Sequence, residues 1–119
     1  MGLLAKLFGS RNDEKTAPAE QEVEVHFAYG STNFQHVYAL GDQLQTALLE
    51  AKAGEYDGHA IPADGSEGRY FFFGPDAEAI YKALAPTLEA SPLMRGATIT
   101  LHYGPRRRGT PKRVIELPE

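Results

Sequence analysis

The chain has 119 residues, of which 42% are hydrophobic and 24% are charged, proportions typical of a single globular domain. It contains no cysteine, which excludes disulfide frameworks, thiolate nucleophiles and cysteine-based zinc sites, and which fits a reducing compartment. No apolar run approaches the ~20 residues of a membrane span and no secretory signal is recognisable, so we expect a cytoplasmic protein.

The net charge of −4 is unevenly distributed along the chain. Residues 21–104 contain four Lys/Arg against eleven Asp/Glu, whereas residues 105–119 contain five basic residues against two acidic ones. An acidic body repels phosphates, which disfavours nucleic-acid binding. The basic residues of the C-terminal loop are best interpreted as a charged hairpin that blunts a sheet edge: Arg106, Arg107, Arg108, Lys112 and Arg113.

Residues 1–21 are predicted to form an amphipathic segment and a flexible linker that precede a single domain over residues 22–119. Helical spacing places four large apolar residues on one face of about two turns: Leu3, Leu4, Leu7 and Phe8. A helix this short is marginal in water, so we favour a frayed or folded-back tail. Docking on a protein partner, or peripheral contact with a membrane surface, is the alternative.

The first half of the domain predicts a strand, a helix and a second strand. Residues 22–29 alternate between apolar and polar side chains, as in a half-buried strand. A Gly-Ser-Thr-Asn turn then leads into helical spacing over residues 34–51, although Gly41 weakens this helix and Asp42 offers a later start. Gly54 is expected to end the helix. In the strand over residues 55–61, an Asp-Gly pair is typical of a bulge.

The second half predicts a third strand over residues 69–73, a helix capped by Asp76, a fourth strand over residues 97–103 and a short fifth strand over residues 114–117. Pro86 should kink or split the second helix. Right-handed crossovers place both helices on the same face of the sheet. We therefore predict an α+β fold, a ferredoxin-like βαββαβ two-layer sandwich whose antiparallel sheet gains a C-terminal edge strand.

In that topology the first and third strands lie in the sheet centre, and one face of the sheet has no helix over it. The third strand carries four consecutive aromatic residues, so two of them should face away from the helices. Exposed aromatic patches usually mark interfaces. We expect an interaction surface on the helix-free face, formed by four residues: His26, Tyr70, Phe72 and His102.

A second group of polar residues offers a weaker indication of a ligand site, and its members are Ser31, Asn33, Asp57 and His59. Histidine with carboxylate can ligate zinc or iron, and His26, His59 and His102 could converge with Asp57. No two of the histidines fall at a short ligand spacing, so no metal or other cofactor is expected. Catalytic motifs are also missing from the sequence. The favoured function is a non-enzymatic interaction or regulatory module that binds itself or another protein. The alternative is a small-molecule or metal-binding protein, or an enzyme, that uses Asp57 and His59 with His26 and His102.

Three blocks of the sequence, EYDGH, FGPDAEA and SPLMRG, resemble a group of small uncharacterised bacterial α+β proteins with EYDGH, YGPDAD-like and SPLxRG blocks. The resemblance covers residues 23–117. It implies a bacterial, cytoplasmic setting and a compact α+β domain, and it brings no activity, cofactor or catalytic residue with it.

Overall fold

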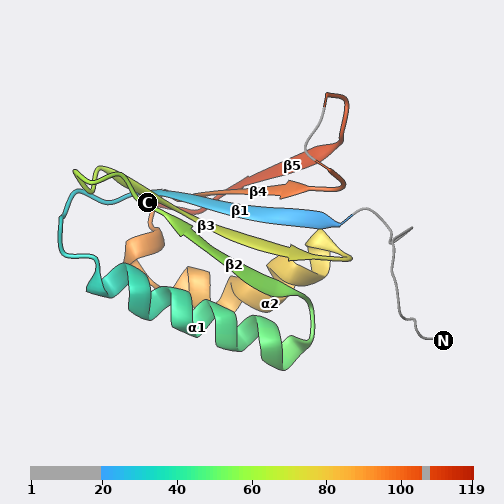
Figure 1. Cartoon of the computed structure of the whole chain (residues 1–119), viewed down its shortest axis with the longest axis horizontal. Coiled ribbons are helices and arrows are strands. Elements are labelled where there is room, and N and C mark those ends of the chain that lie inside the picture. Colours follow the sequence, from blue (N-terminus) through green and yellow to red (C-terminus); the bar gives the residue numbers. More distant parts are fainter. Residues whose placement is uncertain (1–19, 106–107) are drawn as a thin grey trace, which may run out of the picture.

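The computed structural model describes residues 20–105 and 108–119. The predicted segment Leu3–Phe8, and Arg106 and Arg107 of the basic loop, lie outside the described residues. The elements in chain order are β1 (Gln21–Ala28), α1 (Gln35–Ala51), β2 (Glu55–Ala60), β3 (Glu67–Gly74), α2 (Ala77–Ala90), the 3₁₀ turn η1 (Pro92–Met94), β4 (Thr98–His102) and β5 (Lys112–Glu116) (Figure 1).

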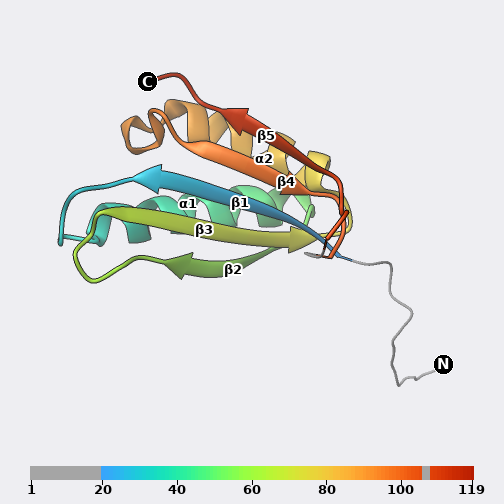
Figure 2. The same cartoon turned by 90° about the horizontal axis from the view of Figure 1, so that it is seen from above.

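The strands form one five-stranded sheet in the order β2-β3-β1-β4-β5, and every neighbouring pair is antiparallel. Both helices lie under the same face, and the opposite face carries no helix (Figures 1 and 2). The predicted α+β class, the shared helix face and the fifth strand at the sheet edge are therefore confirmed. β2 and β5 are the two outer strands, so each leaves one edge unpaired within the described part of the chain.

The core lies between the sheet and the two helices. Val23, Val25 and Phe27 point from β1 toward the helices and are at most 1% exposed. They pack with apolar residues of the neighbouring elements, which include Leu44, Leu48, Ile80, Leu84, Ile99 and Leu101. Burial of each such side chain stabilises the fold by about 1.5–3 kcal/mol, so this layer holds sheet and helices together.

The aromatic strand β3 corrects part of the predicted surface, because Tyr70 and Phe72 are fully buried on the helix side. The Tyr70 ring stacks on Phe27 with centroids 5.4 Å apart, and its hydroxyl donates to the Val37 carbonyl. The alternate residues Phe71 and Phe73 lie on the helix-free face, with only partial burial. The expectation that Tyr70 and Phe72 line the open face is therefore wrong.

Glycine positions explain how α1 approaches the sheet. The helix runs through Gly41 without interruption, so a later start near Asp42 is wrong. A Cβ at Gly41 would lie 3.0 Å from the Tyr56 hydroxyl and 3.3 Å from the Tyr70 ring. At the other end, Lys52 rather than Gly54 adopts the left-handed conformation, with φ of 53°.

Helix α2 begins as the sequence predicts. The Asp76 side chain accepts from the backbone N–H groups of Glu78 at 3.0 Å and Ala79 at 3.4 Å, which confirms it as the N-cap. The helix then continues through Pro86 to Ala90, so Pro86 does not split it. Pro86 has no N–H, so the carbonyl of Lys82 lacks its helical hydrogen bond. Both residues lie on the exposed side of the helix, where water can bond to that carbonyl.

Candidate functional site

The helix-free face is built from alternate residues of four strands. The registers place Glu22 opposite Phe73 and His102, and His26 opposite Arg69 and Thr98. Because side chains alternate along a strand, all residues in phase with these share the face. They include Glu24, Glu67, Phe71 and Thr100, and Lys112, Val114 and Glu116 of β5.

Ion pairs cross the centre of this face from β4 to β3. Arg69 Nη1 donates to Glu24 Oε2, and His26 Nε2 contacts Glu67 Oε1. Arg69 Nη2 lies 3.7 Å from Glu67 Oε1, and His102 Nε2 lies 3.9 Å from Glu24 Oε1. We call these five residues, His26, Glu67, Arg69, Glu24 and His102, the sheet-face network.

The inner part of the sheet-face network is withdrawn from solvent. The side chains of Glu24 and His102 are 9% and 14% exposed, whereas those of His26 and Glu67 are each 40% exposed. A carboxylate at this depth requires cationic and hydrogen-bonding partners, and such partners fix its position. The network therefore presents a rigid, charged centre rather than an adaptable one.

The two aromatic residues of β3 on this face, Phe71 and Phe73, do not belong to the core cluster. Phe73 lines a hollow of about 240 Å³ together with Glu20, Glu22, Gly104 and Pro105. The Phe73 ring therefore lies beside carboxylates at the end of the sheet where β1 begins. The sequence did contain a signal for them. Glu67 and Arg69 precede Phe71 and Phe73 at spacings of two, so charged and aromatic side chains share one face.

The predicted histidines divide between the two faces. His26 and His102 lie on the helix-free face as expected, on either side of Glu24. His59 instead lies on the helix side of β2, where its ring is 5.2 Å from that of Tyr38 and its Nδ1 is 3.2 Å from the Tyr56 hydroxyl. The structure thus does not bring His59 together with His26 and His102, as the alternative ligand or metal site would require.

The remaining ligand candidates have local structural roles. Asp57 lies where the register shifts between Tyr56 and Gly58, which confirms the predicted bulge. In the turn before α1, the Asn33 N–H donates to Ser31 Oγ at 3.0 Å, and Asn33 Oδ1 accepts from the Gln35 N–H at 3.1 Å. No three His, Asp or Glu side chains of residues 20–105 and 108–119 are grouped so that they could hold a metal ion.

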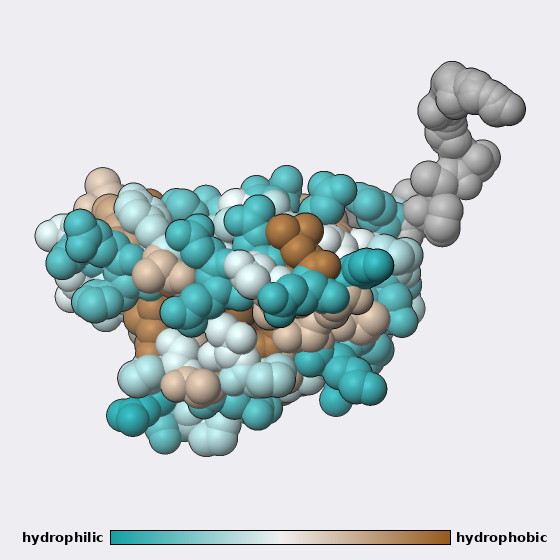
Figure 3. Space-filling view, turned by 90° about the horizontal axis from the view of Figure 1, so that it is seen from below, coloured by the Kyte–Doolittle hydropathy of each residue, from teal (hydrophilic) through white to brown (hydrophobic). Residues whose placement is uncertain are grey.

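A cavity on the helix side is one that the sequence did not indicate. It measures about 800 Å³ and lies between the first half of α1 and the end of α2. Its lining includes Tyr29, His36, Leu40, Gln43, Pro86 and Leu93, which come from separate segments, so no local pattern identifies it. The helix side is mostly covered by hydrophilic residues, with hydrophobic residues visible in separate areas (Figure 3).

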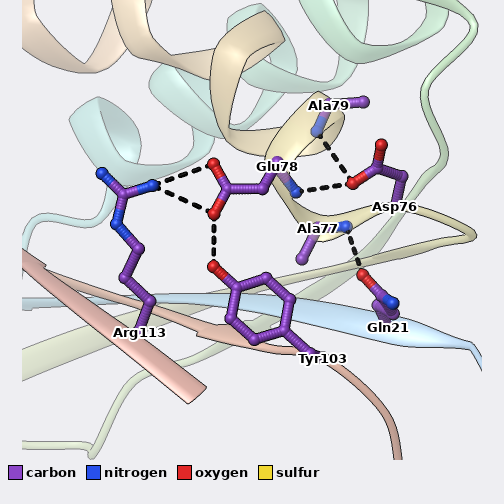
Figure 4. Close-up of polar contacts among 7 residues, drawn as sticks. All are labelled: Gln21, Asp76, Ala77, Glu78, Ala79, Tyr103 and Arg113. Atoms are coloured by element: carbon purple, nitrogen blue, oxygen red, sulfur yellow. Dashed lines mark hydrogen bonds and ion pairs between the residues drawn. The ribbon is translucent and has the colours of Figure 1, made fainter. Parts of the chain in front are cut away.

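The first turn of α2 is tied to the C-terminal hairpin. The Arg113 guanidinium and the Tyr103 hydroxyl both donate to the Glu78 carboxylate (Figure 4). The hydrogen bond from Tyr103, and then that from Arg113, lower the pKa of Glu78. On the same turn, Gln21 Oε1 accepts from the Ala77 N–H at 2.7 Å. Arg113 of the basic loop therefore has a structural partner in its own chain.

Comparisons with other proteins give no independent indication of function. Within the described residues, no helix has the length and apolar character needed to cross a membrane. No model of a known protein family, no curated protein and no solved structure matches this chain. Its function must therefore be inferred from its own surfaces.

Proposed function

We propose that this protein is a non-enzymatic interaction module that binds a polypeptide partner at the helix-free sheet face. The observation that carries the proposal is the position of Phe71 and Phe73, two large aromatic side chains placed outside the core and beside charged groups. Aromatic anchors next to polar side chains are the residue types that dominate binding energy at protein interfaces.

The charges around these rings favour a basic partner segment. Glu20 and Glu22 border the hollow beside Phe73, and Glu55 of β2 lies opposite Phe73 on its other side. Lysine or arginine side chains next to an apolar residue would complement this arrangement. Such charges guide association and choose between partners more than they add affinity.

The helix-free face of a second copy of this chain is a poor candidate for the partner that binds there. Face-to-face packing of two copies would bury the sheet-face network against itself and bring carboxylates toward carboxylates. Taking further charges out of water costs several kcal/mol per ion unless each gains a partner. The proposed occupant is therefore a different polypeptide.

We further assign the fold to the ferredoxin-like arrangement, with β5 as an added edge strand. The order of the first four strands, β2-β3-β1-β4, and the shared position of the two helices support this assignment. The complete lack of cysteine supports a reducing, cytoplasmic setting.

Site-specific photo-crosslinking in cells tests the proposed function. Photoreactive benzoylphenylalanine is introduced at Phe73, and at Leu49 as a matched control, because Leu49 is 57% exposed on the helix layer. We expect crosslinks from position 73 that map to a segment with Lys or Arg beside an apolar residue, and no such product from position 49. Equal products at both positions, or none at position 73, would contradict the proposal.

One observation supports a second candidate, a small-molecule carrier. The 800 Å³ cavity between the helices combines apolar residues with the polar groups of His36, Gln43 and Ser91. Native mass spectrometry of the protein purified from its own cells would then show an added organic mass. Ala39 lines the cavity, and the cavity-filling variant Ala39→Trp should remove that mass. A bare mass for the wild type would reject this candidate.

A further inference from the structure

The outer edge of β5 is open, continuous and short. Lys112, Val114 and Glu116 are exposed, and Val114 retains 50% of its surface. No other strand of the described chain pairs with this edge (Figure 2). The opposite sheet edge differs, because the bulge between Tyr56 and Gly58 interrupts β2. β5 is therefore the more regular of the two edges. Lys112, which by itself would blunt this edge, has an opposite charge, Glu116, on the same strand.

Two hydrogen bonds establish which backbone groups of β5 point outward. The Leu117 N–H donates to the Ala97 carbonyl at 2.9 Å, and at the other end the Pro111 carbonyl accepts from the Tyr103 N–H at 3.1 Å. In an antiparallel pair, every second residue bonds to the neighbouring strand, so Arg113 and Ile115 bond to β4. The outward N–H and C=O groups belong to the alternate residues, Lys112, Val114 and Glu116.

These three residues have a self-complementary order. If β5 pairs antiparallel with β5 of a second copy around Val114, then Val114 faces Val114 and Lys112 faces Glu116 of the second copy. The residues whose backbone groups point outward are then the ones that face each other. Each facing pair can exchange two backbone hydrogen bonds, and the two Lys–Glu pairs join opposite charges.

A shift of the register by two residues in either direction keeps outward residues opposite each other but loses this match of charges. With Lys112 opposite Val114, Arg113 would face Arg113 of the second copy, and like charges directly opposite are unfavourable. Pro111 and Pro118 flank residues 112–117, and Pro118, which is in phase with the outward residues, has no N–H to donate, so regular pairing of the outer edge ends before it. The Arg113 side chain turns to Glu78 and leaves the edge clear.

We propose that the outer edge of β5 pairs with β5 of a second copy of this chain, in the register centred on Val114. The result is a two-fold symmetric dimer with one continuous sheet, held by backbone hydrogen bonds and two symmetry-related Lys112–Glu116 pairs. The dimer leaves the helix-free faces of both copies uncovered, so it is independent of the proposed partner binding.

Analytical ultracentrifugation of the full chain over a concentration series tests the dimer. The wild type should show a concentration-dependent dimer. Glu116→Lys and Lys112→Glu should each weaken it by about tenfold or more, and the double variant K112E/E116K should restore it to within about threefold. A wild type that stays monomeric, or a double variant that remains as weak as the single ones, would overturn the proposal.

A backbone variant tests the register separately from charge. Val114→Pro removes an outward N–H that β4 does not use, so the monomer should fold while the dimer is lost. Val114→Thr is the matched control and should dimerise like the wild type. A dimer that survives Val114→Pro but is lost in Phe73→Arg would place the contact on the sheet face instead and overturn the edge pairing.

Discussion

Arg113 on β5 contacts both carboxylate oxygens of Glu78 in the first turn of α2, at 2.9 and 3.0 Å. The Tyr103 hydroxyl donates to the same carboxylate (Figure 4). Because Arg113 and Tyr103 lie at either side of the hairpin, this contact joins the C-terminal edge of the sheet to the helix layer. It also makes the position of the hairpin sensitive to pH.

The stabilising effect of this contact is lost both at low pH, through Glu78, and at high pH, through Tyr103. The pKa of Glu78 is lowered in the folded state, mainly by the Tyr103 hydrogen bond, so its stabilising effect is present above the ordinary glutamate pKa and is lost as pH falls through the lowered value. The pKa of Tyr103 is raised, mainly by the same hydrogen bond, so its contribution is present below pH 10.0 and is lost as pH rises through the raised value.

Glu78→Gln should therefore reduce the change in the free energy of unfolding with pH, at both low and high pH. The measurement is the free energy of unfolding by urea from pH 3 to pH 11, with Glu89→Gln as a control on the exposed side of the same helix. If Glu78→Gln and Glu89→Gln give profiles of the same shape, the carboxylate does not hold the hairpin.

The alternation of β3 predicts opposite outcomes for neighbouring phenylalanines. Phe72→Ala should cost about 3–5 kcal/mol in the free energy of unfolding, because it leaves a cavity in the core. Phe71→Ala should cost less than about 1.5 kcal/mol, since its ring is only partly buried on the open face. Urea denaturation of both variants is the test, and equal losses would contradict the register of β3.

Gly41→Ala should destabilise the protein even though alanine favours helices by ~1 kcal/mol. The added methyl group would lie 3.0 Å from the Tyr56 hydroxyl and 3.3 Å from the fully buried Tyr70 ring. Removing the nearer atom with Tyr56→Phe should reduce the cost, as a double-mutant cycle of unfolding free energies would show. Additive effects would mean that the helix and Tyr56 are not in contact as described.

The sheet-face network predicts coupling between two strands. Arg69→Gln should cost about 1–3 kcal/mol in the free energy of unfolding, because the withdrawn carboxylate of Glu24 loses one of its cations. Adding Glu24→Gln should recover part of that loss, and Thr100→Ser serves as a control on the same face. If the recovery is absent in thermal and urea unfolding, the ion pair does not contribute.

The sequence predicted the class, the element order and the side shared by the helices, because apolar periodicity and turn residues are local signals. It did not determine which half of the aromatic strand is buried, since four aromatic residues in a row contain no alternation of their own. The neighbours resolve the ambiguity. A Cβ at Gly68 would lie 2.3 Å from the Phe27 ring, so that side of β3 faces the core.

Other features depend on contacts between distant segments and have no local signal. In the sequence Gly41 weakens the predicted helix, whereas in the fold its lack of a Cβ lets α1 approach Tyr56 and Tyr70. The Asp-Gly pair predicts the bulge in β2 but not the face on which His59 lies. His59 pairs with Tyr70 on the helix side, because the bulge shifts the register by one residue. The cavity between the helices likewise forms only when α1 and the end of α2 meet.

The most direct test of the proposed function is the affinity of the segment captured at Phe73, made as a synthetic peptide and measured by isothermal titration calorimetry. Phe73→Ala should weaken binding about tenfold or more, which is about 1.4 kcal/mol, whereas Leu49→Ala should leave the affinity unchanged. Added salt should weaken binding to the wild type, because the face is acidic. Wild-type affinity in Phe73→Ala would contradict binding at the helix-free face.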